Sequence, residues 1–334
     1  SLARMAHVFA AESKNHTGDR RGLDLGKQAG PERGLRVELD RGPLVGGTDK
    51  QNRAVLLLLV ASGARADPEA VTITTEHYVL TAETTRDEAE ALGRVLEAAW
   101  PHYRAFFGDE PKLDDGERLG IVFCAKREGF VRRLREAGIL PPHAGGYYHP
   151  ANRTAYAWRQ PTIYFTRCLL LHEALHQFHY LAKTDNETAL PPWYAEGLAE
   201  YLSRHTWDGE TLEVGVVPPV SLKDLPAEAF DTLAAEDADL EVLLAEKTYG
   251  REVAWAVVHY LVAADGGKHR RKFDRVAAKL DRGTRNHKLL FKTFGRPKKL
   301  RKALLEWLPT VQEPWTQVFN EWEGTAPGCF RGTA

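Results

Sequence analysis

Two histidines and a glutamate within Leu169–Tyr180 have the types and the spacing for metal chemistry. The stretch reads LLLHEALHQFHY and contains His172, Glu173 and His176. Each residue of an α-helix turns about 100°, so residues four apart lie one turn apart on the same face. His172 and His176 can therefore donate ring nitrogens to one metal ion, while Glu173 would stand beside that ion as a base for an activated water.

The residues around this motif predict a largely buried helix over Thr162–Ala182. Leu171, Leu175 and Phe178 recur at helical spacing and form a broad apolar stripe. An HExxH string can arise by chance in a chain with 13 histidines, so the motif alone is a hypothesis. Imidazole and carboxylate groups on a buried helix are costly without partners, however, and a metal ion supplies partners for several at once.

A catalytic zinc ion usually has three protein ligands, so a third ligand is needed elsewhere in the chain. One arrangement places a third histidine six residues beyond the second, but that position is Ala182 and this solution is excluded. Another takes a glutamate from a following helix. Glu196 lies twenty residues after His176, and Glu200 lies one turn further along a helix predicted over Tyr194–Ser203.

The two motifs together resemble a known family. HEALH at 172–176 followed by WYAEGLAEY at 193–201 looks like the gluzincin metallopeptidases, which combine HExxH with a downstream glutamate. The segment from about Tyr78 to Leu308, including YGREVAWAVVHYL at 249–261, is similar to the peptidase-MA-like domains of uncharacterised secreted bacterial proteins. The resemblance implies an α+β fold, a mainly helical zincin-like metallopeptidase domain with a small mixed sheet and an edge hairpin, followed by C-terminal helices.

The resemblance also implies a role for each residue of the two motifs. One Zn²⁺ ion would be bound by His172, His176 and Glu196, and Glu173 would act as the general base in the hydrolysis of a peptide or protein substrate. Glu200 would hold a ligand histidine by its other N–H group and so fix the tautomer of that ring.

Two further features of such enzymes are less clear in this chain. Their oxyanion is stabilised by a tyrosine or histidine, and the best candidate is Tyr249, with Tyr201 and His179 as alternatives. The glycine-rich hairpin resembles their substrate-binding edge strand, which would assign substrate contacts to Gly145, Gly146 and Tyr147. A purely structural hairpin is an equally good interpretation. The chain lacks the GxMEN strand by which aminopeptidases hold a free amino terminus.

Strands and helices predicted around the motifs are consistent with an α+β domain. Alternating and β-branched residues predict strands over Val71–Leu80 and Arg118–Ala125, and a hairpin of two aromatic strands over Gly145–His149 and Thr154–Trp158. Helical periodicity and capping residues predict helices over Asp87–Phe107, Lys126–Ala137 and Gly250–Ala263.

Composition is ordinary for a globular protein. The 334 residues carry 45 Lys and Arg against 46 Asp and Glu, a net charge of -1 that gives no overall attraction to nucleic acid, and no specific nucleic-acid partner is expected. The 3 cysteines are widely spaced, so neither a disulfide framework nor a cysteine metal site is indicated.

The N-terminal part predicts export. Residues 1–52 read as a disordered extension or a start site placed too early, and residues 53–66 combine a basic start, an apolar run and an Ala-Arg-Ala cleavage pattern. This pattern predicts a signal peptide, although a buried strand is the alternative; without export, the protein would be cytoplasmic. The catalytic domain is predicted over 67–263 and a packed helical region over 264–334, with no transmembrane anchor.

The C-terminal region is basic, with fifteen Lys and Arg against two Asp between residues 268 and 302. Solvated faces of packed helices explain this better than nucleic-acid binding, because the basic residues are spread over several helices. Two alternatives to a peptidase stay open. One is a zinc-stabilised binding or scaffolding module without catalysis, and the other is a protein that binds an anionic polymer through these helices.

Overall fold

The computed structural model describes residues 69–184, 186, 188–217, 220–221, 224–245, 250–284, 288–311 and 316–317. The extension predicted over 1–52 and the signal peptide predicted over 53–66 lie outside the described residues. Both therefore stay predictions, as does export. The described part is α+β, with many helices, a small mixed sheet and a two-stranded hairpin, which confirms the predicted α+β class.

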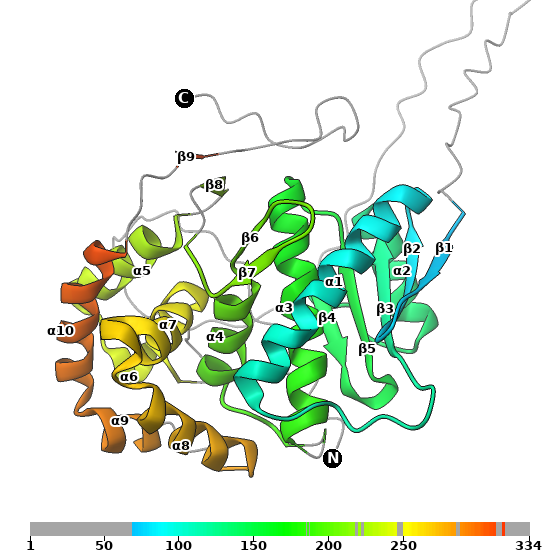
Figure 1. Cartoon of the computed structure of the whole chain (residues 1–334). Helices are drawn as coiled ribbons and strands as arrows, with labels where there is room; N and C mark the ends of the chain where they lie inside the picture. The colour runs from blue at the N-terminus through cyan, green and yellow to red at the C-terminus, as the bar shows by residue number, and fades with distance from the viewer. Residues whose placement is uncertain are drawn as a thin grey trace, which may run out of the picture. The chain divides into compact units, whose positions relative to one another are not determined.

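A five-stranded mixed sheet forms the first structural layer (Figure 1). The strand order is β1-β2-β3-β5-β4, in which β2, β3 and β5 run parallel and the two edge strands run antiparallel to their neighbours. The strands are β1 (Val71–Thr74), β2 (Tyr78–Glu83), β3 (Leu119–Cys124), β4 (Gly146–His149) and β5 (Thr154–Trp158). Strand β4 pairs only with β5, as predicted for an edge hairpin, and the short helix η2 (Pro150–Asn152) connects them.

The single strand predicted over Val71–Leu80 is wrong. The chain instead turns between β1 and β2, where the Thr75 amide donates to the Tyr78 carbonyl oxygen at 2.9 Å, and the two strands then pair antiparallel. The turn contains none of the glycine, proline or asparagine residues that usually mark turns. The β-branched residues on either side therefore read as one continuous strand.

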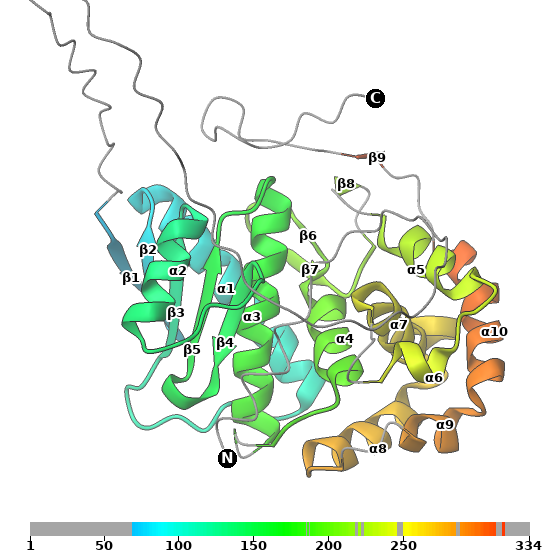
Figure 2. The same cartoon turned by 180° about the vertical axis from the view of Figure 1, so that it is seen from behind.

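Helices cover both faces of the sheet (Figures 1 and 2). Helices α1 (Arg86–Phe107) and α3 (Ile163–Lys183) pack on one face and enclose the main hydrophobic core, while α2 (Arg127–Glu136) packs on the other over a smaller core. Helix α1 begins at Thr85, whose side chain accepts from the Glu88 amide, and ends at Gly108, which adopts a left-handed φ of 72°. These boundaries lie close to those predicted.

The remaining helices extend the main core away from the sheet. Helix α4 (Pro192–Ser203) packs between α3 and α7 (Arg251–Gly267), and the backbone of α7 leaves helical geometry at Ala264–Gly266. The other elements of this part are the hairpin β6 (His205–Trp207) and β7 (Leu212–Val214), strand β8 (Val220–Ser221), which pairs with β9 (Thr316–Gln317), and helices α5 (Leu225–Ala234) and α6 (Leu240–Leu243).

The basic C-terminal region folds as α8 (Arg270–Asp281), α9 (Lys288–Phe294), α10 (Pro297–Trp307) and η3 (Leu308–Thr310). Its apolar residues join the main core, so these helices pack on the rest of the fold. Two of its cations serve that packing. The guanidinium of Arg270 lies 4.3 Å from the centre of the Phe106 ring, and Arg301 donates to the Leu233 carbonyl oxygen at 2.6 Å.

Among the described residues, no helix combines the length and the apolar character that crossing a membrane requires.

Candidate metal centre

Helix α3 carries the three residues of the HExxH motif. Its N-terminus is capped by Thr162, whose side chain accepts a hydrogen bond from the Phe165 amide at 2.9 Å. His172, Glu173 and His176 lie in the middle of the helix and are all buried. The two imidazole rings project from successive turns, with ring centroids 4.7 Å apart, which is the arrangement that the sequence spacing predicts.

Helix α4 brings two carboxylates against the same part of α3. Pro192 lies in its first turn, where the missing amide costs no helical hydrogen bond. Gly197 allows α7 to approach closely, because a Cβ atom there would lie 2.6 Å from the Ala254 carbonyl oxygen. Packed between α3 and α7, the helix holds Glu196 and Glu200 in the interior.

His172, His176 and Glu196 converge on one point, and we call these three residues the metal cluster. His172 Nε2 lies 3.1 Å from both His176 Nε2 and Glu196 Oε2, and His176 Nε2 lies 3.5 Å from Glu196 Oε1. Imidazole nitrogens and carboxylate oxygens offer lone pairs, so three such groups facing one another can ligate a cation held between them. The prediction that these residues could hold a metal ion is confirmed.

Charge attraction within the metal cluster is strong. Burial acts to raise the pKa of Glu196, but the charge of His176 and hydrogen bonds from both histidines outweigh burial and hold this pKa well below its usual range. Burial likewise acts to lower the pKa of His176, and the Glu196 carboxylate reverses the effect, so the pKa of His176 is raised. Positive charge is therefore favoured at the point where the three side chains meet.

Glu173 lies beside the metal cluster. Burial is the main cause of its raised pKa, and the charge of Glu196 acts in the same direction, while the two histidines act against it. A carboxylate with a raised pKa accepts a proton more readily than an exposed one, which suits a general base.

The edge strand β4 passes directly against Glu173. A Cβ atom on Gly146 would lie 2.6 Å from both Cγ and Oε1 of Glu173, so only glycine fits there without displacing the carboxylate. Gly145 lies next to Gln160 and Leu169. Tyr147 points to the opposite face of the sheet, where it packs with the smaller core. Of the three predicted substrate contacts, Gly146 lies directly against Glu173. The pKa of Tyr147 is raised by burial and also by the charge of Glu173.

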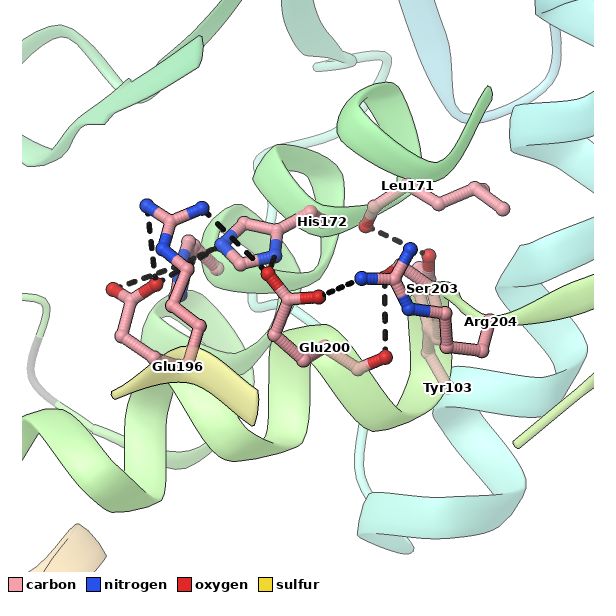
Figure 3. Close-up of polar contacts among 9 residues, drawn as sticks. Tyr103, Leu171, His172, Glu196, Glu200, Ser203 and Arg204 are labelled. Atoms are coloured by element: carbon pink, nitrogen blue, oxygen red, sulfur yellow. Dashed lines mark hydrogen bonds and ion pairs between the residues drawn. The ribbon is translucent and has the colours of Figure 1, made fainter. Parts of the chain in front are cut away.

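Glu200 lies at the Nδ1 side of the His172 ring, whereas the Nε2 side faces His176 and Glu196. The Oε1 atom of Glu200 is 3.4 Å from His172 Nδ1, and its Oε2 atom accepts a hydrogen bond from Arg204. Figure 3 shows His172 between Glu196 and Glu200, with Arg204 beyond Glu200. A carboxylate in this position can orient the ring of a ligand histidine, which is the role that the family resemblance implied for Glu200.

Two arginines at this site were missed by the sequence analysis. Arg251, in the first turn of α7, places Nη2 3.8 Å from Glu196 Oε2 and Nη1 3.6 Å from Glu200 Oε1. Arg251 lies within the segment YGREVAWAVVHYL at 249–261, which resembles the same family, but no role followed for it because its contacts depend on how α7 packs on α4. Arg204 follows Glu200 by four residues, and this i, i+4 spacing of opposite charges could have identified it.

Of the predicted oxyanion donors, Tyr249 lies outside the described residues, so its role stays a prediction. The ring of Tyr201 packs against His259 with centroids 5.1 Å apart and against Phe106 at 6.4 Å.

His179 belongs to a separate buried group, which we call the His–Asp–Tyr cluster. His179 Nε2 lies 2.9 Å from Asp281 Oδ1, and the Tyr194 hydroxyl donates to the same oxygen at 3.0 Å. This cluster joins α3 and α4 to α8, and the ring of His179 also stacks on Phe107 with centroids 4.7 Å apart. The interpretation of His179 as an oxyanion donor is therefore not supported by its contacts.

A second group in the described residues has potential ligands, namely Glu76, His77 and Glu97. Glu97 already accepts two hydrogen bonds from His77, one from its amide at 2.8 Å and one from Nδ1 at 2.7 Å. Glu76 is largely exposed, with a side chain 83% accessible. In this group His77 and Glu97 already pair with each other, whereas in the metal cluster the ligand atoms of three side chains face one point.

Comparison with known proteins found no family model and no curated protein that matches this chain.

Proposed function

We propose that this protein is a zinc-dependent metallopeptidase of the gluzincin type, with a zincin-like fold. The observation that carries the proposal is the convergence of the metal cluster beside a buried glutamate with a raised pKa. Two imidazoles and one carboxylate suit zinc best among common divalent ions. A bound zinc ion would supply Lewis acidity, which polarises a carbonyl group and makes water nucleophilic near neutral pH.

The protein's own residues have three tasks in this reaction. His172, His176 and Glu196 hold the ion, and Glu200 supports the ring of His172 through Nδ1. Glu173 accepts a proton from the attacking water and delivers it to the amine that leaves. The close passage of β4 at Gly146 supports an extended peptide lying along that strand, because an edge strand can pair with a peptide backbone.

The variant Glu173→Gln tests this proposal. It keeps the size of the side chain and removes the base, so we expect zinc content to be unchanged and peptide hydrolysis to fall about 10²- to 10⁴-fold. Metal analysis and a chelator-sensitive assay on a peptide library measure the two quantities. Unchanged hydrolysis in the variant would refute the role of Glu173, and a wild-type protein that binds zinc but cleaves nothing would favour the non-catalytic binding module.

A further inference from the structure

Arg204 is a buried cation that the proposed reaction does not use. It lies directly after the last helical residue of α4, and its side chain is 8% exposed. A buried guanidinium is costly unless it is paired and hydrogen-bonded. The partner is Glu200, whose side chain is 7% exposed and which lies one helical turn earlier.

The pair is poorly explained by stability alone. Desolvation of two buried charges offsets most of their attraction, and buried ion pairs are often replaceable by apolar residues without loss of stability. A surface arginine would interact with the C-terminal end of the α4 dipole without this cost. The pair lies at the C-terminal end of α4, where Glu200 also contacts His172 of the metal cluster, and this position points to a role in geometry.

Arg204 fixes the orientation of the Glu200 carboxylate. By donating to Oε2, it leaves Oε1 facing His172 Nδ1 at 3.4 Å (Figure 3). The same Oε1 atom lies 3.6 Å from Arg251 Nη1, which adds a second cation beside the carboxylate. A carboxylate at Nδ1 favours the tautomer with a proton on that nitrogen. The Nε2 lone pair of His172 is then directed to the point where the metal cluster converges.

Arg204 also contacts α3, the helix that carries the histidines. Burial raises the pKa of the Cys168 thiol while the charge of Arg204 acts against this rise, and the Phe165 ring centre lies 6.0 Å from the guanidinium carbon. Cys168 precedes His172 by one helical turn. The same side chain therefore contacts both helices that supply ligands, next to the ligand that Glu200 orients.

We propose that Arg204 is a positioning residue for metal binding, which acts through Glu200 to hold His172 in the ligating orientation. This inference rests on the proposed function, because it requires the metal cluster to bind an ion. It goes beyond that function by assigning part of the metal affinity to a cation that touches neither the ion nor a substrate.

The test measures the affinity of the purified protein for Zn²⁺ alone, by competition with a chromophoric chelator. The variants are Arg204→Met, Glu200→Gln and the double variant. We expect each single change to weaken zinc binding about 10- to 100-fold. The double variant should bind no more weakly than the weaker single one, because both changes interrupt the same contact. The absorption spectrum of bound Co²⁺ should change in all three.

A control at another arginine–glutamate pair separates positioning from simple loss of an ion pair. Arg133, whose side chain is 32% exposed, places Nε 2.9 Å from Oε1 of the buried Glu83, which Arg132 also contacts at 2.8 Å. Both arginines lie on α2, on the opposite face of the sheet from α3. Arg133→Met should lower stability and leave the Kd for Zn²⁺ and the Co²⁺ spectrum unchanged. A stability effect alone cannot then account for weaker metal binding in Arg204→Met.

Each outcome decides the inference. Zinc binding as tight in Arg204→Met as in the wild type, or losses that add up in the double variant, would overturn it. If Arg204→Met does not fold, Arg204→Lys keeps the charge but loses the planar fork; about threefold to tenfold weaker binding is then expected, and wild-type binding overturns the inference. A wild-type protein that binds no Zn²⁺ would instead refute the proposed function itself.

Discussion

Two buried groups of histidine and carboxylate lie between α3 and α4, and they differ in what completes them. In the metal cluster, the nitrogen and oxygen atoms of His172, His176 and Glu196 face one another. In the His–Asp–Tyr cluster, one carboxylate oxygen faces a ring nitrogen and a hydroxyl group, both of which can donate to it. The first group can hold a cation between its ligand atoms, whereas in the second Asp281 accepts from two donors and only His179 Nδ1 lacks a hydrogen-bond partner among the described residues.

The difference shows that residue type and burial do not identify a metal site. His176 and His179 are three residues apart on the same buried helix and both lie near a carboxylate. What separates them is the balance of donors and acceptors around each ring. Predictions on Asp281 and Tyr194 test this contrast, and a third concerns His259, a buried histidine outside both groups.

The largest effect is expected from Asp281→Ala. The change leaves the buried side chains of His179 and Tyr194 without their acceptor, and we expect the free energy of unfolding to fall by about 4 kcal/mol. Urea unfolding of the metal-free protein measures it, and zinc stoichiometry should be unchanged. Asp274→Ala is the control, since Asp274 forms an exposed pair with Arg270 on the same helix and should contribute less than about 1 kcal/mol. Equal losses of unfolding free energy in the two variants would contradict the interpretation that Asp281 stabilises the fold through His179 and Tyr194.

A smaller effect is expected at His259, a buried histidine surrounded by aromatic rings. Burial lowers its pKa to about 4 from the ordinary value of 6.5, and the rings of Tyr201, Trp255 and Trp307 lie about 5 Å away. The unfolded chain therefore binds a proton between these two pH values that the folded protein does not, so stability falls as the pH falls through this range.

His259 should lower the free energy of unfolding by about 2 kcal/mol between pH 7 and pH 5. The variant His259→Phe lacks the titrating group and should lose about 2 kcal/mol less than the wild type over the same range. Urea unfolding at both pH values measures the difference. The same pH dependence in variant and wild type would show that this ring does not titrate as its burial requires.

The smallest effect is expected from Tyr194→Phe. The change removes one of the two donors to Asp281, while His179 keeps its contact, so the cost should be about 1 kcal/mol. Thermal unfolding of the metal-free protein measures it. A loss as large as that of Asp281→Ala would mean that the hydroxyl, rather than the carboxylate, holds the cluster together.

The parts of the site that the sequence predicted are those set by local geometry. The i, i+4 spacing of His172 and His176 follows from the helical repeat, and it holds in the structure. Glu196 and Glu200 were found because their motif resembles a known one, although their contact with α3 depends on how two helices pack. The apolar face of α3 and the edge hairpin were likewise readable from the chain.

The parts that the sequence did not predict depend on packing between distant segments. Arg251 reaches Glu196 only because Gly197 lets α7 lie close to α4. The turn at Thr75 has no conventional turn residue, so β1 and β2 were predicted as a single strand. Asp281 comes from α8, whose sequence is mostly basic, and no local pattern in that sequence marks Asp281 as a buried carboxylate.

The most direct test of the contrast is the metal content of three proteins purified in the same way and equilibrated with Zn²⁺. We predict one tightly bound ion per chain in the wild type, one in His179→Ala and none in His176→Ala. Loss of the ion in both variants, or no tightly bound ion in the wild type, would contradict the assignment of the metal site to His172, His176 and Glu196.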